Sequence, residues 1–294
     1  MDIGFIGLGR MGAPMARRLA GAGHRLHVYD VVPEAVARFA ADTECERPLT
    51  PRAVGAAAEI VITMLPEGRH VRQALLGENG VLEGLSPGSI LIDMTSASPV
   101  GTRELGAELA EKGFPLVDAP VSGGVKKAAD GTLAIMVGGE ADVVEQVLPL
   151  LTLMGKTFLT GGPGTGHAMK AMNNYLSAGT LALSAEAVIA GSKFGLDPKV
   201  MVDILNASTG RSNSTEHKYP TFILPRSFDS GFALGLMAKD LRLAVEVSRS
   251  VHSQNTLLTE LSRLYDEAEK TLGFAADNTE LVRYFESLSE DEDA

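Results

Sequence analysis

The sequence is short of the residues that build disulfide scaffolds and cysteine metal sites. Its 294 residues include one cysteine, Cys45. One thiol cannot close an intrachain disulfide or supply a zinc cluster, which excludes a stapled secreted fold and a cysteine-based metal centre. The six histidines do not have metal-ligand spacing either. We therefore expect no metal site, and a reducing compartment.

Long hydrophobic runs and positive charge are also scarce. No run of 18 or more apolar residues occurs, which excludes an obvious membrane-spanning helix. A strand-like segment begins at Ile3 and leaves no room for a secretory signal. The 26 Lys and Arg are outnumbered by 37 Asp and Glu, and the formal net charge of -11 repels nucleic-acid phosphates and anionic lipid. We expect a cytoplasmic protein that binds neither nucleic acid nor membrane.

The first half of the chain does contain short apolar runs separated by helical patterns. Each run is bounded by Gly, Pro or Asp, as buried parallel strands commonly are. Alternation of this kind predicts an α/β fold of the doubly wound, Rossmann type, with a mainly parallel sheet covered on both faces. The runs are Ile3–Ile6, Leu26–Tyr29, Ile60–Met64, Ile90–Ile92, Leu116–Asp118 and Leu133–Val137.

The second half has a different pattern. The stretch Thr165–Phe194 is rich in apolar residues, lacks proline and is followed by Gly195, which predicts one interdomain helix about 45 Å long. We expect a dinucleotide-binding domain over residues 1–162 and an all-helical substrate and oligomerisation domain over residues 163–294. Later helix starts are marked by Asp197 before Pro198, and by Asp277 three residues before Glu280.

Three glycines directly after the first predicted strand follow the pattern G-x-G-x-x-G. The first permits a tight turn, the second lets the backbone approach a pyrophosphate, and the third lets the helix pack on the strand. Because strand, helix and second strand follow in order, a glycine turn without a ligand is the weaker explanation. We assign the whole segment to a dinucleotide: Gly7, Leu8, Gly9, Arg10, Met11 and Gly12.

Asp30 ends the second predicted strand, where an acidic side chain can accept hydrogen bonds from the adenosine ribose. A 2′-phosphate would meet like charge there, so the residue favours NAD over NADP; the alternative is a turn aspartate. Two further strand ends lie where ligands cross the edge of such a sheet. They give the expected cofactor contacts Met64, Leu65, Pro66 and Thr95.

Lys170, Asn173 and Asn174 lie on one face of the long predicted helix, at i, i+3 and i+4. Alcohol oxidation requires removal of the hydroxyl proton, and a partly buried lysine with a lowered pKa can take and return it. An asparagine one turn away can hold the hydroxyl or carboxylate in place. On spacing alone, the alternative is a lysine that extends to solvent beside two amides.

Four motifs occur in order along most of the chain: the glycine segment with Met15 and Ala16, Asp118–Gly124, Gly164–Asn174 and Lys239–Leu241. Together they resemble the β-hydroxyacid dehydrogenases, the family of 3-hydroxyisobutyrate dehydrogenase, tartronate semialdehyde reductase and 2-(hydroxymethyl)glutarate dehydrogenase. The resemblance implies a Rossmann-type domain, an interdomain helix and a helical C-terminal domain like that of 6-phosphogluconate dehydrogenase. It also implies a homodimer or homotetramer.

The resemblance assigns roles to individual positions. It makes Lys170 the acid/base residue and Asn174, beside Asn173, a substrate-binding partner. It makes Lys239 a lysine that reaches the cofactor from the second domain, with Asp240 as an acidic neighbour; a solvated charged pair is the alternative. The substrate carboxylate would be held by a segment that from the residues alone is merely a turn: Ser122, Gly123 and Gly124.

Two residues near these motifs have open roles. Arg211 lies where family members place substrate-selective residues, and either pairs with a second substrate carboxylate or braces the preceding helix. His167 stands three residues before Lys170, and either lines the site or takes part in catalysis.

We predict an NAD-dependent oxidoreductase that interconverts a small 3-hydroxy or ω-hydroxy carboxylate and its semialdehyde by hydride transfer. The patterns of P-loop enzymes, metalloproteases and serine hydrolases do not occur. A semialdehyde or imine reductase on the same scaffold is one alternative, although imine reductases generally replace the lysine that this chain keeps. A regulator that binds NAD without turnover is the other, and it would need neither Lys170 nor Asn174.

Overall fold

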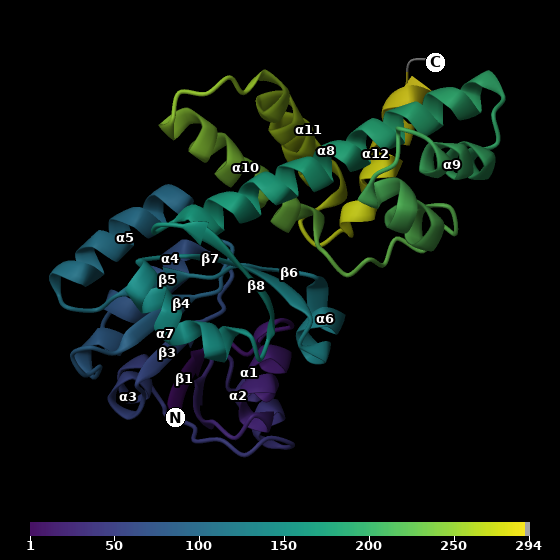
Figure 1. The fold of residues 1–294 in the computed structure, drawn as a ribbon. Coiled ribbons are helices and arrows are strands. Elements are labelled where there is room, and N and C mark those ends of the chain that lie inside the picture. The colour runs from purple at the N-terminus through teal and green to yellow at the C-terminus, as the bar shows by residue number, and fades with distance from the viewer. Residues whose placement is uncertain (292–294) are drawn as a thin grey trace. The chain divides into compact units, whose positions relative to one another are not determined.

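The computed structural model describes residues 1–291 and consists of two compact units, Met1–Lys170 and a second that begins at Ala171. The first is an α/β unit with a largely parallel sheet, and the second is helical, so the predicted fold class is confirmed (Figure 1). No helix in the described part of the chain combines the length and apolarity needed to cross a membrane.

The sheet of the first unit has the strand order β2-β1-β3-β4-β5-β7-β6, and β8 pairs with β7. The first five strands of this order are parallel, whereas β7 runs antiparallel to β5 and β6. All six predicted strands are present, and two others, β6 and β8, were not predicted. The strands are β1 (Asp2–Ile6), β2 (Arg25–Tyr29), β3 (Ile60–Thr63), β4 (Ile90–Asp93), β5 (Leu116–Asp118), β6 (Val121–Ser122), β7 (Leu133–Gly138) and β8 (Gly155–Gly161).

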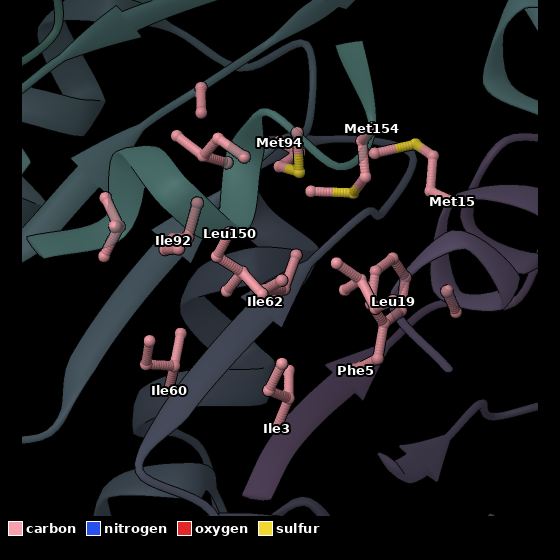
Figure 2. Packing of buried hydrophobic residues seen from close by; sticks show 14 of the residues in the cluster. Ile3, Phe5, Met15, Leu19, Ile60, Ile62, Ile92, Met94, Leu150 and Met154 are labelled. Atoms are coloured by element: carbon pink, nitrogen blue, oxygen red, sulfur yellow. The ribbon is translucent and has the colours of Figure 1, made fainter. Parts of the chain in front are cut away.

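Helices cover both faces of this sheet because the strand side chains alternate between two apolar clusters. Ile3 and Phe5 of β1 pack with Met15 and Leu19 on one side (Figure 2), whereas Ile6 belongs to the cluster on the other side. The sheet is therefore doubly wound, as the sequence predicts. Its helices are α1 (Gly12–Gly21), α2 (Pro33–Ala40), α3 (Pro51–Ala57), α4 (Gly68–Leu76), α5 (Pro99–Glu111), α6 (Gly124–Asp130) and α7 (Ala141–Leu151), with a 3₁₀ turn η1 (Val81–Glu83).

The long helix α8 has the predicted bounds, Thr165–Phe194, and Gly195 follows it with a φ of 106° that suits glycine. Its residues from Ala171 onward belong to the second unit, where Ala178 and Leu181 enter a core that also contains Tyr265. The other elements of this unit are α9 (Pro198–Ala207), the π-type helix η2 (Ser214–Ile223), α10 (Leu234–Ser250), α11 (Thr256–Leu272), the 3₁₀ turn η3 (Asn278–Glu280) and α12 (Leu281–Asp291).

Candidate active site

The glycine loop between β1 and α1 leaves room for a ligand at one of its three positions. A Cβ on Gly7 would lie 2.3 Å from the Met64 carbonyl oxygen, and one on Gly12 would lie 1.9 Å from the Gly7 carbonyl oxygen. Both glycines are therefore required by the protein's own backbone. A Cβ on Gly9 would meet nothing within 4 Å. The loop is open there, in front of a helix N-terminus, which fits a pyrophosphate.

Asp30 joins the end of β2 to this loop. Its Oδ2 accepts a hydrogen bond from the Leu8 N–H (2.7 Å) and its Oδ1 accepts one from the Val32 N–H (2.8 Å). Each carboxylate oxygen keeps a second acceptor position. An acidic acceptor beside an open glycine loop is the arrangement that an adenosine ribose and its diphosphate need, so these residues fit NAD.

The predicted contacts after β3 and β4 lie together. The Leu65 N–H donates to the Thr95 hydroxyl (3.0 Å), and the Thr95 N–H donates to Asp93 (3.0 Å). Thr63 also donates to Asp93, at 2.9 Å. Thr95 is fully buried, so its hydroxyl holds the two strand ends in register with each other. Met64 and Pro66 flank Leu65 in the same segment.

The first turn of α8 is fixed by a carboxylate from β5. The buried Asp118 accepts the N–H of Gly164 through Oδ1 (2.7 Å) and the N–H of His167 through Oδ2 (2.8 Å). These are N–H groups that a helix start leaves without an intrahelical partner. Asp118 thus caps the helix that carries Lys170, a role that the sequence did not reveal.

His167 is enclosed in this corner of the first unit. Its Nε2 lies 2.8 Å from the Thr95 carbonyl oxygen, and its Nδ1 lies 2.8 Å from the Thr102 hydroxyl. A carbonyl only accepts, so Nε2 carries a proton. With both ring nitrogens engaged and 1% of the residue exposed, His167 anchors α8 to its surroundings. This anchoring role differs from both roles that the sequence leaves open, lining the site and taking part in catalysis.

The turn Ser122–Gly124 joins β6 to α6 with two successive positive φ angles, 138° at Gly123 and 74° at Gly124. This backbone is costly for any residue with a Cβ, which explains the paired glycines. A Cβ on Gly124 would meet nothing within 4 Å, so the backbone there is open to a close approach. The turn can therefore offer N–H groups to an anion.

In the second unit, Asn174 lies at the centre of a chain of polar side chains. Its Nδ2 donates to Asp240 Oδ2 (2.5 Å), and its Oδ1 accepts from Asn173 (3.1 Å). Lys239 Nζ lies 3.2 Å from the other Asp240 oxygen. Because the carboxylate only accepts, it fixes the orientation of the Asn174 amide. The family resemblance gave Asp240 as an acidic neighbour of Lys239, and the sequence did not reveal the bond to Asn174.

Lys170 is on α8, one helical turn before Asn174, and is the last residue of the first unit.

Arg211 follows α9, with 64% of its side chain exposed, and its Nε lies 3.6 Å from Glu216. The Arg211 guanidinium therefore has a carboxylate partner within the protein. Glu216 belongs to η2, which follows Arg211, so this contact ties Arg211 to the segment after it and not to the preceding helix α9.

Comparison with known proteins matches nearly the whole chain. Residues 2–162 match the family model of the NAD binding domain of 6-phosphogluconate dehydrogenase. Residues 164–285 match the model described as NAD-binding of NADP-dependent 3-hydroxyisobutyrate dehydrogenase.

Relatives with assigned activities are also similar along most of their length. The 2-(hydroxymethyl)glutarate dehydrogenase of Eubacterium barkeri is 41% identical over 85% of this chain and 83% of its own. The human mitochondrial 3-hydroxyisobutyrate dehydrogenase is 41% identical over 85% of this chain and 76% of its own. The structure of Mycobacterium tuberculosis 3-hydroxyisobutyrate dehydrogenase with L-serine is 33% identical, with a TM-score of 0.88 over 97% of this chain and 98% of that one.

A Rossmann-type unit that fits NAD, followed by a helical unit, defines the protein as an NAD-dependent oxidoreductase. Within that class, the chain belongs to the β-hydroxyacid dehydrogenase family, which confirms the resemblance found in the sequence.

Proposed function

We propose that the chain interconverts a small 3-hydroxy carboxylate and its semialdehyde, with Lys170 as the general acid/base. The observation that carries this proposal is the buried polar chain around Asn174, which follows Lys170 by one turn of α8. Two relatives are named as dehydrogenases of hydroxy acids of this kind. The hydrogen bonds to Asp240 and Asn173 offset the cost of burying the Asn174 amide, and they fix its orientation, as the binding of an alcohol in one pose requires.

Each residue then has a definable step. Lys170 removes the hydroxyl proton during oxidation and returns it during reduction, a contribution of roughly 10²- to 10⁴-fold in rate. Asn174, oriented by Asp240, holds the reacting hydroxyl, with Asn173 beside it. Bound NAD supplies the hydride acceptor. The substrate carboxylate is held by the turn of Ser122, Gly123 and Gly124.

We propose the predicted residues as the cofactor site, within an NAD-binding domain over residues 1–162 and a helical domain over 163–294. Gly9 and its neighbours hold the diphosphate at the helix start, and Asp30 holds the ribose. The remaining contacts in this proposal are Gly7, Leu8, Arg10, Met11, Gly12, Met64, Leu65, Pro66, Thr95 and Lys239.

The activity is tested by NADH formation from purified protein with NAD, using 3-hydroxyisobutyrate, 2-(hydroxymethyl)glutarate and glycerate as substrates. Lys170→Ala should lower kcat at least about 100-fold because proton transfer is lost. Lys270→Ala, a change at an exposed lysine of α11, is the matched control and should leave kcat unchanged. Full activity in Lys170→Ala would rule out the proposed acid/base role.

We further propose that the protein is cytoplasmic and self-associates, as a homodimer or homotetramer, through an apolar stripe on α8. Leu176, Leu183 and Phe194 are 64%, 67% and 89% exposed. Their spacings of seven and eleven residues return to nearly the same face of a helix. Large apolar side chains aligned on one exposed helix face are typical of a protein–protein contact.

A further inference from the structure

Lys218 lies on η2, a π-type helix that is fastened to α8 by two hydrogen bonds. The Lys218 ammonium donates to the Ser177 hydroxyl at 3.2 Å, and the hydroxyls of Thr180 and Ser214 are also 3.2 Å apart. π-type turns are rare and often occur at functional sites. The position of the Lys218 ammonium against α8 is therefore fixed by the fold.

The charge of this ammonium has no counterion in contact with it among the side chains that the structure describes. No carboxylate of residues 1–289 forms an ion pair with Lys218, and its hydrogen-bond partner is the neutral Ser177 hydroxyl. Burial lowers the pKa of Lys218 to about 8, and the more distant Asp277 only partly opposes this effect. Asp277 itself accepts hydrogen bonds from Ser230 and Gly231. A partly desolvated cation of this kind is stabilised when an anion binds to it.

The position of Ser177 on α8 shows how far such an anion would lie from the proposed substrate-binding residues. It is three residues after Asn174 and four after Asn173, so all three share one face of α8. One helical turn rises about 5.4 Å. The Lys218 ammonium is thus held about one turn further along α8 than the amide that we propose for the substrate hydroxyl.

We propose that Lys218 and Ser177 form a subsite for a second, distal carboxylate of the substrate, which makes the enzyme selective for hydroxy dicarboxylates. The inference rests on the proposed function, because it places the reacting hydroxyl at Asn174. The Lys218 and Ser177 subsite replaces Arg211 as the candidate for binding the second carboxylate, since Arg211 is exposed and pairs with Glu216.

The kinetic test compares 2-(hydroxymethyl)glutarate with 3-hydroxyisobutyrate in the full chain with NAD. Lys218→Met should raise KM for the dicarboxylate roughly 10- to 100-fold, the range of a charge-assisted hydrogen bond, and leave kcat and KM for the monocarboxylate within about threefold. Ser177→Ala should raise the same KM by a smaller factor. Lys199→Met, a change at an exposed lysine of α9, is the matched control and should change neither substrate. Equal losses on both substrates in Lys218→Met would overturn the subsite.

A binding measurement separates this inference from the proposed reaction. In calorimetry of the NAD-saturated protein, glutarate should bind at least about tenfold more tightly than butyrate, and Lys218→Met should abolish the difference. Circular dichroism of each variant verifies that it is folded. Absent turnover with both hydroxy acids would contradict the proposed function alone, whereas equal binding of glutarate and butyrate would contradict the subsite.

Discussion

Burial of the Lys218 side chain makes the free energy of unfolding depend on pH. Its pKa falls from the ordinary 10.5 to about 8 in the folded protein, chiefly by burial. Between these two values the unfolded chain binds more protons than the folded chain, so the free energy of unfolding rises with pH. Lys218→Met should remove this rise, which amounts to about 1–3 kcal/mol.

Urea unfolding at pH 7.5 and pH 9.5 measures this difference in the wild type, Lys218→Met and Lys199→Met. Lys199 is an exposed lysine of α9, so its variant should retain the wild-type rise. An unchanged rise in Lys218→Met would mean that the ammonium is solvated in the folded protein.

Single residues also show how far the sequence could predict the site. The glycine segment, Asp30 and the lysine–asparagine face of α8 depend on local spacing, which the sequence displays directly. The bond from Asn174 to Asp240 joins residues 66 positions apart, and the bond from Gly164 to Asp118 joins residues 46 apart. Such pairings depend on tertiary packing, and no local pattern encodes them.

At the scale of elements, the start of α8 depends on the carboxylate of Asp118. Asp118→Ala removes the acceptor for two N–H groups and should lower the free energy of unfolding by about 1–3 kcal/mol. Asp118→Asn keeps one acceptor oxygen and should cost less. Urea unfolding measures both, with Asp142→Ala as the control, because Asp142 is an exposed residue in the first turn of α7. Equal stability of Asp118→Ala and Asp142→Ala would contradict the capping role.

Other elements explain which parts of the fold the sequence predicts. The strands β1, β3 and β4 are short, near-continuous apolar runs, and α8 is one long apolar-rich stretch without proline. The lengths and boundaries of these stretches suffice to predict the elements. The unpredicted β8 alternates little and has exposed Phe158 and Leu159. The unpredicted β6 has two residues, and the antiparallel direction of β7 follows from pairings across the sheet. Capping patterns succeeded for α9, where Asp197 accepts the Val200 N–H.

For the whole molecule, the apolar stripe on α8 predicts the assembly state. Leu183→Glu places a charge in the middle of the stripe and should shift a dimer or tetramer towards the monomer. Analytical ultracentrifugation over a range of protein concentrations measures the shift. Leu49→Glu is the matched control, because Leu49 is 89% exposed, belongs to the first unit and is not part of α8. A monomeric wild-type protein, or an unchanged assembly in Leu183→Glu, would contradict the proposed contact.

The glycine loop indicates which of its three glycines can change in a homologue that has lost its cofactor. Gly7 and Gly12 are held by steric conflict with the protein's own backbone, so a lineage that stops using NAD would still need both to fold. Gly9 has no such neighbour, and only a ligand excludes a larger residue there. A descendant that abandons the cofactor is therefore free to change at Gly9 first. Among homologues of this chain, the residue at the position of Gly9 therefore distinguishes proteins that still bind a dinucleotide from proteins that only share the fold.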